Sequence, residues 1–232
     1  MTDLTMTTKE KIEFKKTARV AGFLYLIMFP FALFSLYIRS NLIVPGDAAT
    51  TANNIMASEG LFRSGIVSWL IGQTIFILLI LALYKLLKPV NKNHALLMVI
   101  FALVGVPIAF INELNQFAAL LLLSGADYLR VYEADQLYAQ VLFFLDLHEH
   151  GVSIAQIFWG LWLFPLGYLV YKSGFLPRIL GVLLMIGCFG YLIDSVTFIL
   201  FPNFDVTISQ FTFIGELLLP LWLLIKGVNV EQ

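Results

Sequence analysis

Polar residues that could bind an ion or carry a proton interrupt four otherwise apolar stretches of the sequence. Residues 112–116 read Asn-Glu-Leu-Asn-Gln, and residues 146–150 read Asp-Leu-His-Glu-His. Asp194 and Glu216 stand within two further apolar stretches. Carboxylates and imidazoles can ligate a metal ion, exchange a proton or hydrogen-bond a polar solute. We therefore take eight residues as candidate ligand- or proton-binding groups: Asn112, Glu113, Gln116, Asp146, His148, His150, Asp194 and Glu216.

Helical spacing sorts the segment 146–150 into two faces. At about 100° per residue, Asp146 and His150 share a face, and His148 points roughly 160° away from His150. An Asp and a His four residues apart can share one metal ion or one proton. The spacing therefore predicts a pair of ligands on the face of Asp146 and His150.

A divalent metal site is the most specific chemistry that these residues could form. Its ligands would be Asp146 and His150, completed by Glu113 or Asp194. Glu149 or Glu113 would then be the candidate catalytic base that activates a metal-bound water.

The bases of the sequence lie away from these acids. We expect no Lys or Arg in the deep part of any apolar stretch, so His148 and His150 are the only expected cations near five acids. Surplus acids in such a position must be protonated, hydrated or balanced by a bound cation. The pattern predicts an acidic, histidine-containing polar cavity.

The elements that carry these residues are predicted to be transmembrane helices. The chain has 232 residues, of which 60% are hydrophobic and 12% charged, whereas globular proteins carry roughly a quarter charged residues. Its mean hydropathy is +0.89. A span needs about 20 apolar residues. Six stretches qualify, which predicts an all-α integral membrane bundle: 20–38, 61–87, 95–124, 137–171, 179–201 and 208–225.

The distribution of basic residues predicts the orientation of the spans. Eleven of the 14 Lys and Arg residues fall on the side of the two termini, and the other side holds only Arg39, Arg63 and Arg130. Basic residues favour the cytoplasmic side. We therefore expect a multi-pass protein of the cell membrane with both termini cytoplasmic. Residues 1–19 and 227–232 would be cytoplasmic tails, and residues 20–226 one six-helix domain whose candidate sites lie in its outer half.

The sequence also predicts a short helix outside the spans and kinks within the longest spans. Asp47 is a good N-cap for a helix over 48–59 outside the first two spans. The third and fourth spans exceed the length that a bilayer needs, and Pro107, Gly151 and Pro165 are candidate kink positions.

Three functions fit these observations. The first is binding or transport of a cation, a proton or a small polar solute. The second is a metal-dependent intramembrane hydrolase acting on a lipid or lipid-linked group, and the third is a structural or partner-binding membrane protein. The expected partners are the lipid bilayer and a small ion or solute. The net charge of −1 provides no basic surface for nucleic acid.

Four sequence phrases resemble those of a prokaryotic membrane family known as domain of unknown function 4386. They are LIVPGDAA (42–49), NELNQ (112–116), LDLHEHG (145–151) and SGFLPR (173–178). The resemblance covers about residues 19–225. It implies a multi-pass membrane protein and assigns no activity and no catalytic residue.

Overall fold

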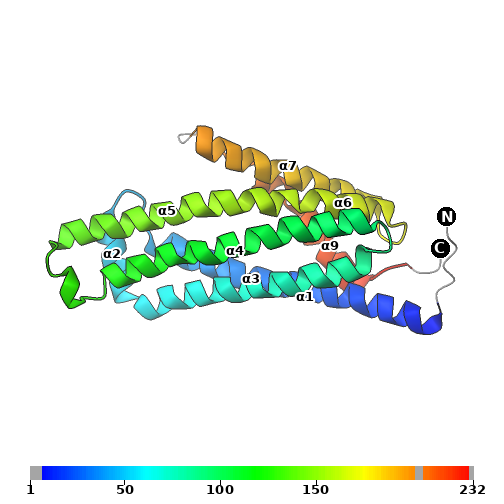
Figure 1. The fold of residues 1–232 in the computed structure, drawn as a ribbon, viewed down its shortest axis with the longest axis horizontal. Coiled ribbons are helices and arrows are strands. Elements are labelled where there is room, and N and C mark those ends of the chain that lie inside the picture. The colour runs from blue at the N-terminus through cyan, green and yellow to red at the C-terminus, as the bar shows by residue number, and fades with distance from the viewer. Residues whose placement is uncertain (1–6, 202–205, 230–232) are drawn as a thin grey trace. The chain divides into compact units, whose positions relative to one another are not determined.

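The described chain is helical throughout, as the sequence predicts. A computed structural model describes residues 7–201 and 206–229, and these residues contain no strand. Residues 1–6 and 230–232 of the expected tails, and residues 202–205 of the last connection, lie outside the described part. The elements, shown in Figure 1, are α1 (Thr8–Leu42), α2 (Ala48–Ala57), α3 (Glu59–Leu87), α4 (Lys92–Leu122), the 3-10 helix η1 (Asp127–Leu129), α5 (Ala134–Leu161), α6 (Leu163–Lys172), α7 (Arg178–Leu200), α8 (Ser209–Thr212) and α9 (Ile214–Ile225).

Five helical segments are long and apolar enough to cross a membrane: α1, α3, α4, the consecutive pair α5 and α6, and α7. The sixth predicted span corresponds to a shorter apolar segment, Ser209–Ile225, which contains α8 and α9. α1 begins at Thr8, so most of the expected N-terminal tail is helical.

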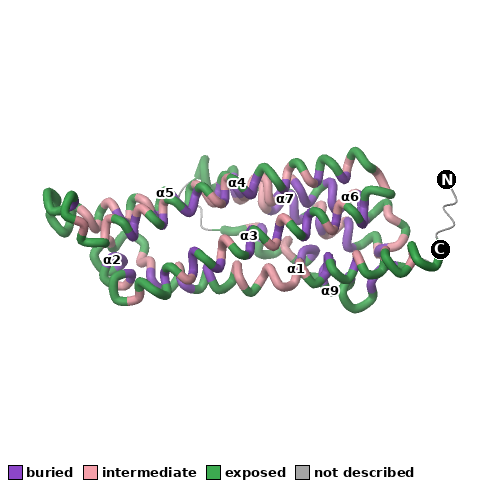
Figure 2. Tube along the Cα trace, turned by 60° about the horizontal axis from the view of Figure 1, so that its bottom comes forward, coloured by how far each residue is buried: buried purple, intermediate pink, exposed green. Residues whose placement is uncertain are grey.

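The exposure of side chains along α4 is the reverse of that in a water-soluble helix. Ile111 and Leu114 are 66% and 63% exposed, whereas Glu113 between them is 2% exposed. Figure 2 shows buried positions recurring between exposed ones along the helices. Large apolar side chains that face outward need lipid as their solvent. The protein is therefore a helical membrane bundle.

The chain divides into two compact units, and several long helices contribute to both. The first unit comprises Met1–Ile27, Ile75–Gly105 and Gln156–Gln232, and the second comprises Met28–Thr74 and Val106–Ala155. Each unit has its own buried residues.

The core of the second unit contains residues from α1, α2, α3, α4 and α5. Its buried members are Ile38, Leu42, Ile55, Phe62, Ile66, Ala119, Leu120, Val141 and Leu145. α2 contributes Ile55 to this core. The predicted cap of α2 is confirmed, because an Asp47 side-chain oxygen accepts the backbone N–H of Thr50 across 2.9 Å. This cap satisfies a donor that the first turn of a helix leaves free.

The core of the first unit surrounds Trp162, which is 1% exposed. Its ring centroid lies 5.1 Å from that of Phe76 and 6.1 Å from that of Tyr25. Trp162 stands at the break between α5 and α6. Pro165 has no N–H to donate to the carbonyl of Leu161, so the predicted interruption near Pro165 is confirmed.

The other two candidate kink positions do not interrupt their helices. α4 continues through Pro107, and α5 continues through Gly151. Gly151 serves close packing instead, since a Cβ at this position would collide with the side-chain amide of Asn112. Glycine therefore lets α5 approach α4 at the level of the polar residues.

Candidate functional site

Polar side chains from three helices meet in the second unit. We call them the buried polar cluster: Arg39 of α1; Asn112, Glu113 and Gln116 of α4; and His148 of α5. Glu149 lies at the rim of this cluster, with a side chain that is 56% exposed.

α4 presents its three polar members on one face because they occupy positions i, i+1 and i+4. All three are buried. Gln116 Nε2 donates to Glu113 Oε2 across 2.6 Å. This bond occupies one oxygen of the carboxylate and leaves the other, Oε1, directed at His148.

His148 is 1% exposed and bonds through both ring nitrogens. Its Nε2 atom lies 3.1 Å from Glu113 Oε1, and its Nδ1 atom lies 3.2 Å from Arg39 Nη1. A guanidinium nitrogen can only donate, so Nδ1 must accept. Nε2 then carries the ring proton and donates it to Glu113. From the contacts of Nδ1 with Arg39 and of Nε2 with Glu113 we assign the neutral Nε2–H tautomer. Gln116 Nε2 also lies 3.1 Å from His148 Nε2.

The backbone around His148 is also fixed by α4. Asn112 Nδ2 donates to the carbonyl oxygen of His148 across 2.8 Å. Asn115 Nδ2 donates in turn to Asn112 Oδ1 across 2.9 Å. The close approach at Gly151 makes this contact possible, because a larger residue would occupy the space of the Asn112 amide.

Arg39 is the cation that the sequence interpretation missed. The expectation that no base lies near the buried acids is wrong, because Arg39 contacts His148 and Glu149. The Arg39 side chain is 11% exposed, and its Cζ atom lies 5.6 Å from the ring centroid of Trp69. α1 extends four residues beyond the predicted end at Ile38, so Arg39 lies on the helix. Its place directly after an apolar stretch was the available signal.

Arg39 retains a donor that the described residues do not use. Its Nε atom is buried and has no hydrogen-bond partner in the described part of the chain. Nη1 also lies 3.8 Å from Glu149 Oε1, and the same oxygen lies 3.7 Å from His148 Nδ1. Glu149 is therefore within reach of both neighbours through small side-chain movements.

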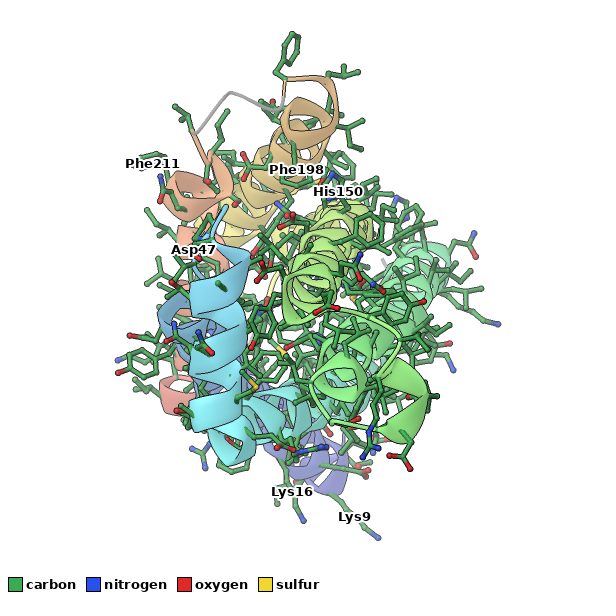
Figure 3. The ribbon with its side chains drawn as sticks, turned by 90° about the vertical axis from the view of Figure 1, so that its left-hand side faces the viewer. Lys9, Lys16, Asp47, His150, Phe198 and Phe211 are labelled. Carbon is green, nitrogen blue, oxygen red and sulfur yellow. The ribbon has the colours of Figure 1, made fainter. Side chains whose placement is uncertain are left out.

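The structure places Asp146 and His150 differently from the predicted ligand pair. Both are exposed, and His150 Nδ1 lies 2.9 Å from the backbone oxygen of Asp146. Figure 3 labels His150 at the periphery of α5. The physical reason is the apolar stripe Val141, Leu145 and Ala155, all buried, which turns His148 inward and the other two outward.

Asp194 and Glu216 belong to the first unit. The two Asp194 carboxylate oxygens accept the backbone N–H groups of Ile208 and Ser209 across 2.6 and 2.8 Å, at the start of α8. Glu216 is buried, and its Oε2 atom accepts the hydroxyl of Tyr25 across 3.2 Å. Asp194 thus has the geometry of a helix cap.

Within the described residues, no group of three or more His, Cys, Asp or Glu side chains could hold a metal ion. The candidate metal ligands Asp146, His150, Glu113 and Asp194 therefore stay a prediction. Hydrogen bonding and proton exchange are the chemistry that the buried polar cluster offers.

Comparisons with known proteins identify the family of this chain. The family model described as domain of unknown function (DUF4386) matches residues 20–227. An uncharacterized protein of Archaeoglobus fulgidus is 37% identical over 164 residues, which cover 68% of this chain and 84% of the relative. No solved structure matches. The chain therefore belongs to the DUF4386 family.

Proposed function

We propose that the buried polar cluster binds and releases a proton, and that the protein thereby moves protons, alone or with a small polar solute, across the cell membrane. The observation that carries this proposal is the position of His148 between the carboxylate of Glu113 and the guanidinium of Arg39. An ionisable group within a membrane span is costly and marks a functional pathway by default.

The unprotonated state has a complete set of bonds around the imidazole. Arg39 donates to Nδ1, and Nε2–H donates to Glu113. Arg39 and Glu113 carry opposite charges, which the neutral ring links without adding a charge of its own. Such pairing reduces the free-energy cost of holding charge in a low-dielectric interior.

A proton that arrives at Nδ1 converts this acceptor into a donor. Arg39 Nη1 and the new N–H would then face each other as two donors, so the guanidinium must withdraw. Glu149 Oε1, 3.7 Å from Nδ1, is positioned to accept from the protonated ring. The proton and the Arg39 side chain therefore compete for one nitrogen atom, which couples protonation to a movement between α1 and α5.

The orientation of the chain forms part of the proposal. The concentration of basic residues on the side of the termini supports cytoplasmic N- and C-termini. With this orientation, α1 ends on the outer side just beyond Arg39, and a proton reaching Glu149 from outside would meet the exposed rim of the cluster first.

Proton flux into liposomes that enclose a pH-sensitive dye tests the proposal. We expect the wild-type protein to dissipate an imposed pH gradient at a set membrane potential, and Glu113→Gln to reduce this flux to the level of protein-free liposomes. Asp146→Asn is the matched control, since it neutralises an exposed acid and should leave the flux unchanged. Wild-type flux at background with any candidate solute added, or an equal loss in both variants, would overturn the proposal.

A further inference from the structure

A groove on the first unit combines basic and apolar side chains in the manner of a lipid site. It has a volume of about 520 Å³ and lies between α1 and α9. Its lining residues are Ile12, Lys15, Lys16, Arg19, Val20, Phe23 and Leu224. No acidic residue is among them.

The two helices that line the groove also make a close backbone contact. A Cβ on Gly22 would lie 2.8 Å from the backbone nitrogen of Leu224 and 2.9 Å from the carbonyl oxygen of Pro220. The absence of a side chain at Gly22 therefore brings the two helices together. Leu224 takes part in this contact and also lines the groove.

The lining residues of α1 form one stripe along the helix. Positions 12, 15, 16, 19, 20 and 23 follow the spacing of a single helical face. This face is about 16 Å long at 1.5 Å per residue. The bases precede residue 20, where the predicted span begins, and the apolar residues continue into it.

The three bases are exposed, and Glu13, the carboxylate near Lys16, is already paired with Lys85. None of Lys15, Lys16 and Arg19 forms an ion pair with another residue in the described ranges. Figure 3 shows the Lys16 side chain extending away from the helices. The neighbouring groove beside Lys85 shares Lys16 and Val20 with this one and also contains Glu13, whose Oε1 atom lies 2.7 Å from Lys85 Nζ.

We propose that this groove binds one anionic phospholipid. Its phosphate would lie among Lys15, Lys16 and Arg19, and one acyl chain would lie along Val20, Phe23 and Leu224. Phe23 and Val20 are 52% and 43% exposed, so the chain has an apolar surface to cover. Basic side chains at the membrane surface attract anionic headgroups, and the apolar continuation into the span selects a lipid over a free anion.

Native mass spectrometry of the detergent-purified protein tests this inference. Phosphatidylglycerol and phosphatidylcholine with identical acyl chains would be titrated onto the wild type and onto the variant Lys15→Gln/Lys16→Gln/Arg19→Gln. We expect tighter binding of phosphatidylglycerol, and a loss of about tenfold or more in the variant, because each base near an anionic headgroup contributes several-fold in affinity. Phosphatidylcholine binding should not change.

A matched variant separates a defined site from general basicity. Lys88→Gln/Lys92→Gln/Lys172→Gln removes the same charge from the first unit outside the groove, and should retain wild-type affinity. An equal loss in both triple variants, equal binding of the two lipids, or displacement of the lipid by millimolar inorganic phosphate would overturn the inference. Phe23→Ser should weaken lipid binding without any change in charge. An unaltered affinity in this variant would show that Phe23 does not contact the acyl chain. Thermal midpoints of all variants, which alter only exposed side chains, should match that of the wild type.

Discussion

The guanidinium of Arg39 donates to the Nδ1 atom of His148 across 3.2 Å and so joins α1 to α5. This bond requires an unprotonated Nδ1 atom. It also gives the buried Glu113 a counter-charge on the far side of the ring. The protonation of one imidazole and the position of one arginine are thereby linked.

The coupling between these two residues should be measurable as an interaction free energy. Arg39→Gln and His148→Gln should each destabilise the protein, and the double variant should be more stable than the sum of the single effects predicts, by about 1–3 kcal/mol. Unfolding in mixed detergent provides the measurement. Additive effects would show that the two side chains do not interact.

Arginine itself should be required at position 39. Lysine keeps the charge but lacks the planar fork that places one nitrogen on His148 while the guanidinium stacks near Trp69. We expect Arg39→Lys to lose most of the stability that Arg39→Gln loses. Full recovery with lysine would indicate a role for charge alone.

Gly151 should tolerate no larger residue. A methyl group there collides with the Asn112 amide, so Gly151→Ala should cost about 1–3 kcal/mol of stability. Adding Asn112→Ala should recover part of this loss because it removes the obstructing amide. Gly60 is the control, since nothing lies within 4 Å of a Cβ there; a comparable cost for Gly60→Ala would contradict the steric explanation.

Asp194 should act as a cap for α8 and not as a proton carrier. Asp194→Ala removes both acceptors of the Ile208 and Ser209 N–H groups. Hydrogen exchange over residues 206–213 should accelerate, by an amount equivalent to about 1–3 kcal/mol, while proton flux persists. Loss of proton flux with unchanged hydrogen exchange would indicate that Asp194 binds a proton or ligand and does not cap α8.

The cap of α2 should depend on pH. The backbone N–H of Thr50 bonds to the ionised Asp47 and thereby lowers the pKa of this carboxyl below its ordinary value. A lowered pKa means that the stabilisation is present above the ordinary range of Asp and disappears as the pH falls through the lowered value. The protection of the Thr50 amide against hydrogen exchange should therefore fall as the pH is lowered through this range.

Asparagine at position 47 separates capping from ionisation. Asn also caps helices but does not titrate, so Asp47→Asn should retain protection that no longer varies over this acidic range. An unchanged pH dependence in this variant would assign the effect to another group.

The composition was sufficient to predict the fold class, because side chains this apolar require lipid around them. Local signals also placed the Asp47 cap and the break near Pro165. The face that α5 turns inward was predictable as well. Buried Val141 and Leu145 precede His148 by seven and three residues, which is the spacing of one helical face. The sequence interpretation instead grouped the charged residues Asp146 and His150.

Long-range pairing could not be inferred from local spacing. Arg39 is separated from His148 by 109 residues, and its distance from the other bases suggested only a place in an outer loop. Similarly, the partners of Asp194 are backbone groups beyond the end of its own helix. Sequence periodicity describes one helix at a time, whereas these contacts depend on how several helices pack.

The protonation state of His148 tests the central claim most directly. The chain has three histidines, so a His94→Gln/His150→Gln variant labelled with ¹⁵N-histidine reports on His148 alone. Solid-state nuclear magnetic resonance in lipid bilayers should show an unprotonated Nδ1 and a protonated Nε2 at high pH. Both nitrogens should be protonated reversibly as the pH falls, together with a change in the Arg39 signals. A proton on Nδ1 at high pH, or a ring that keeps one state while the protein stays folded, would contradict the proposed proton site.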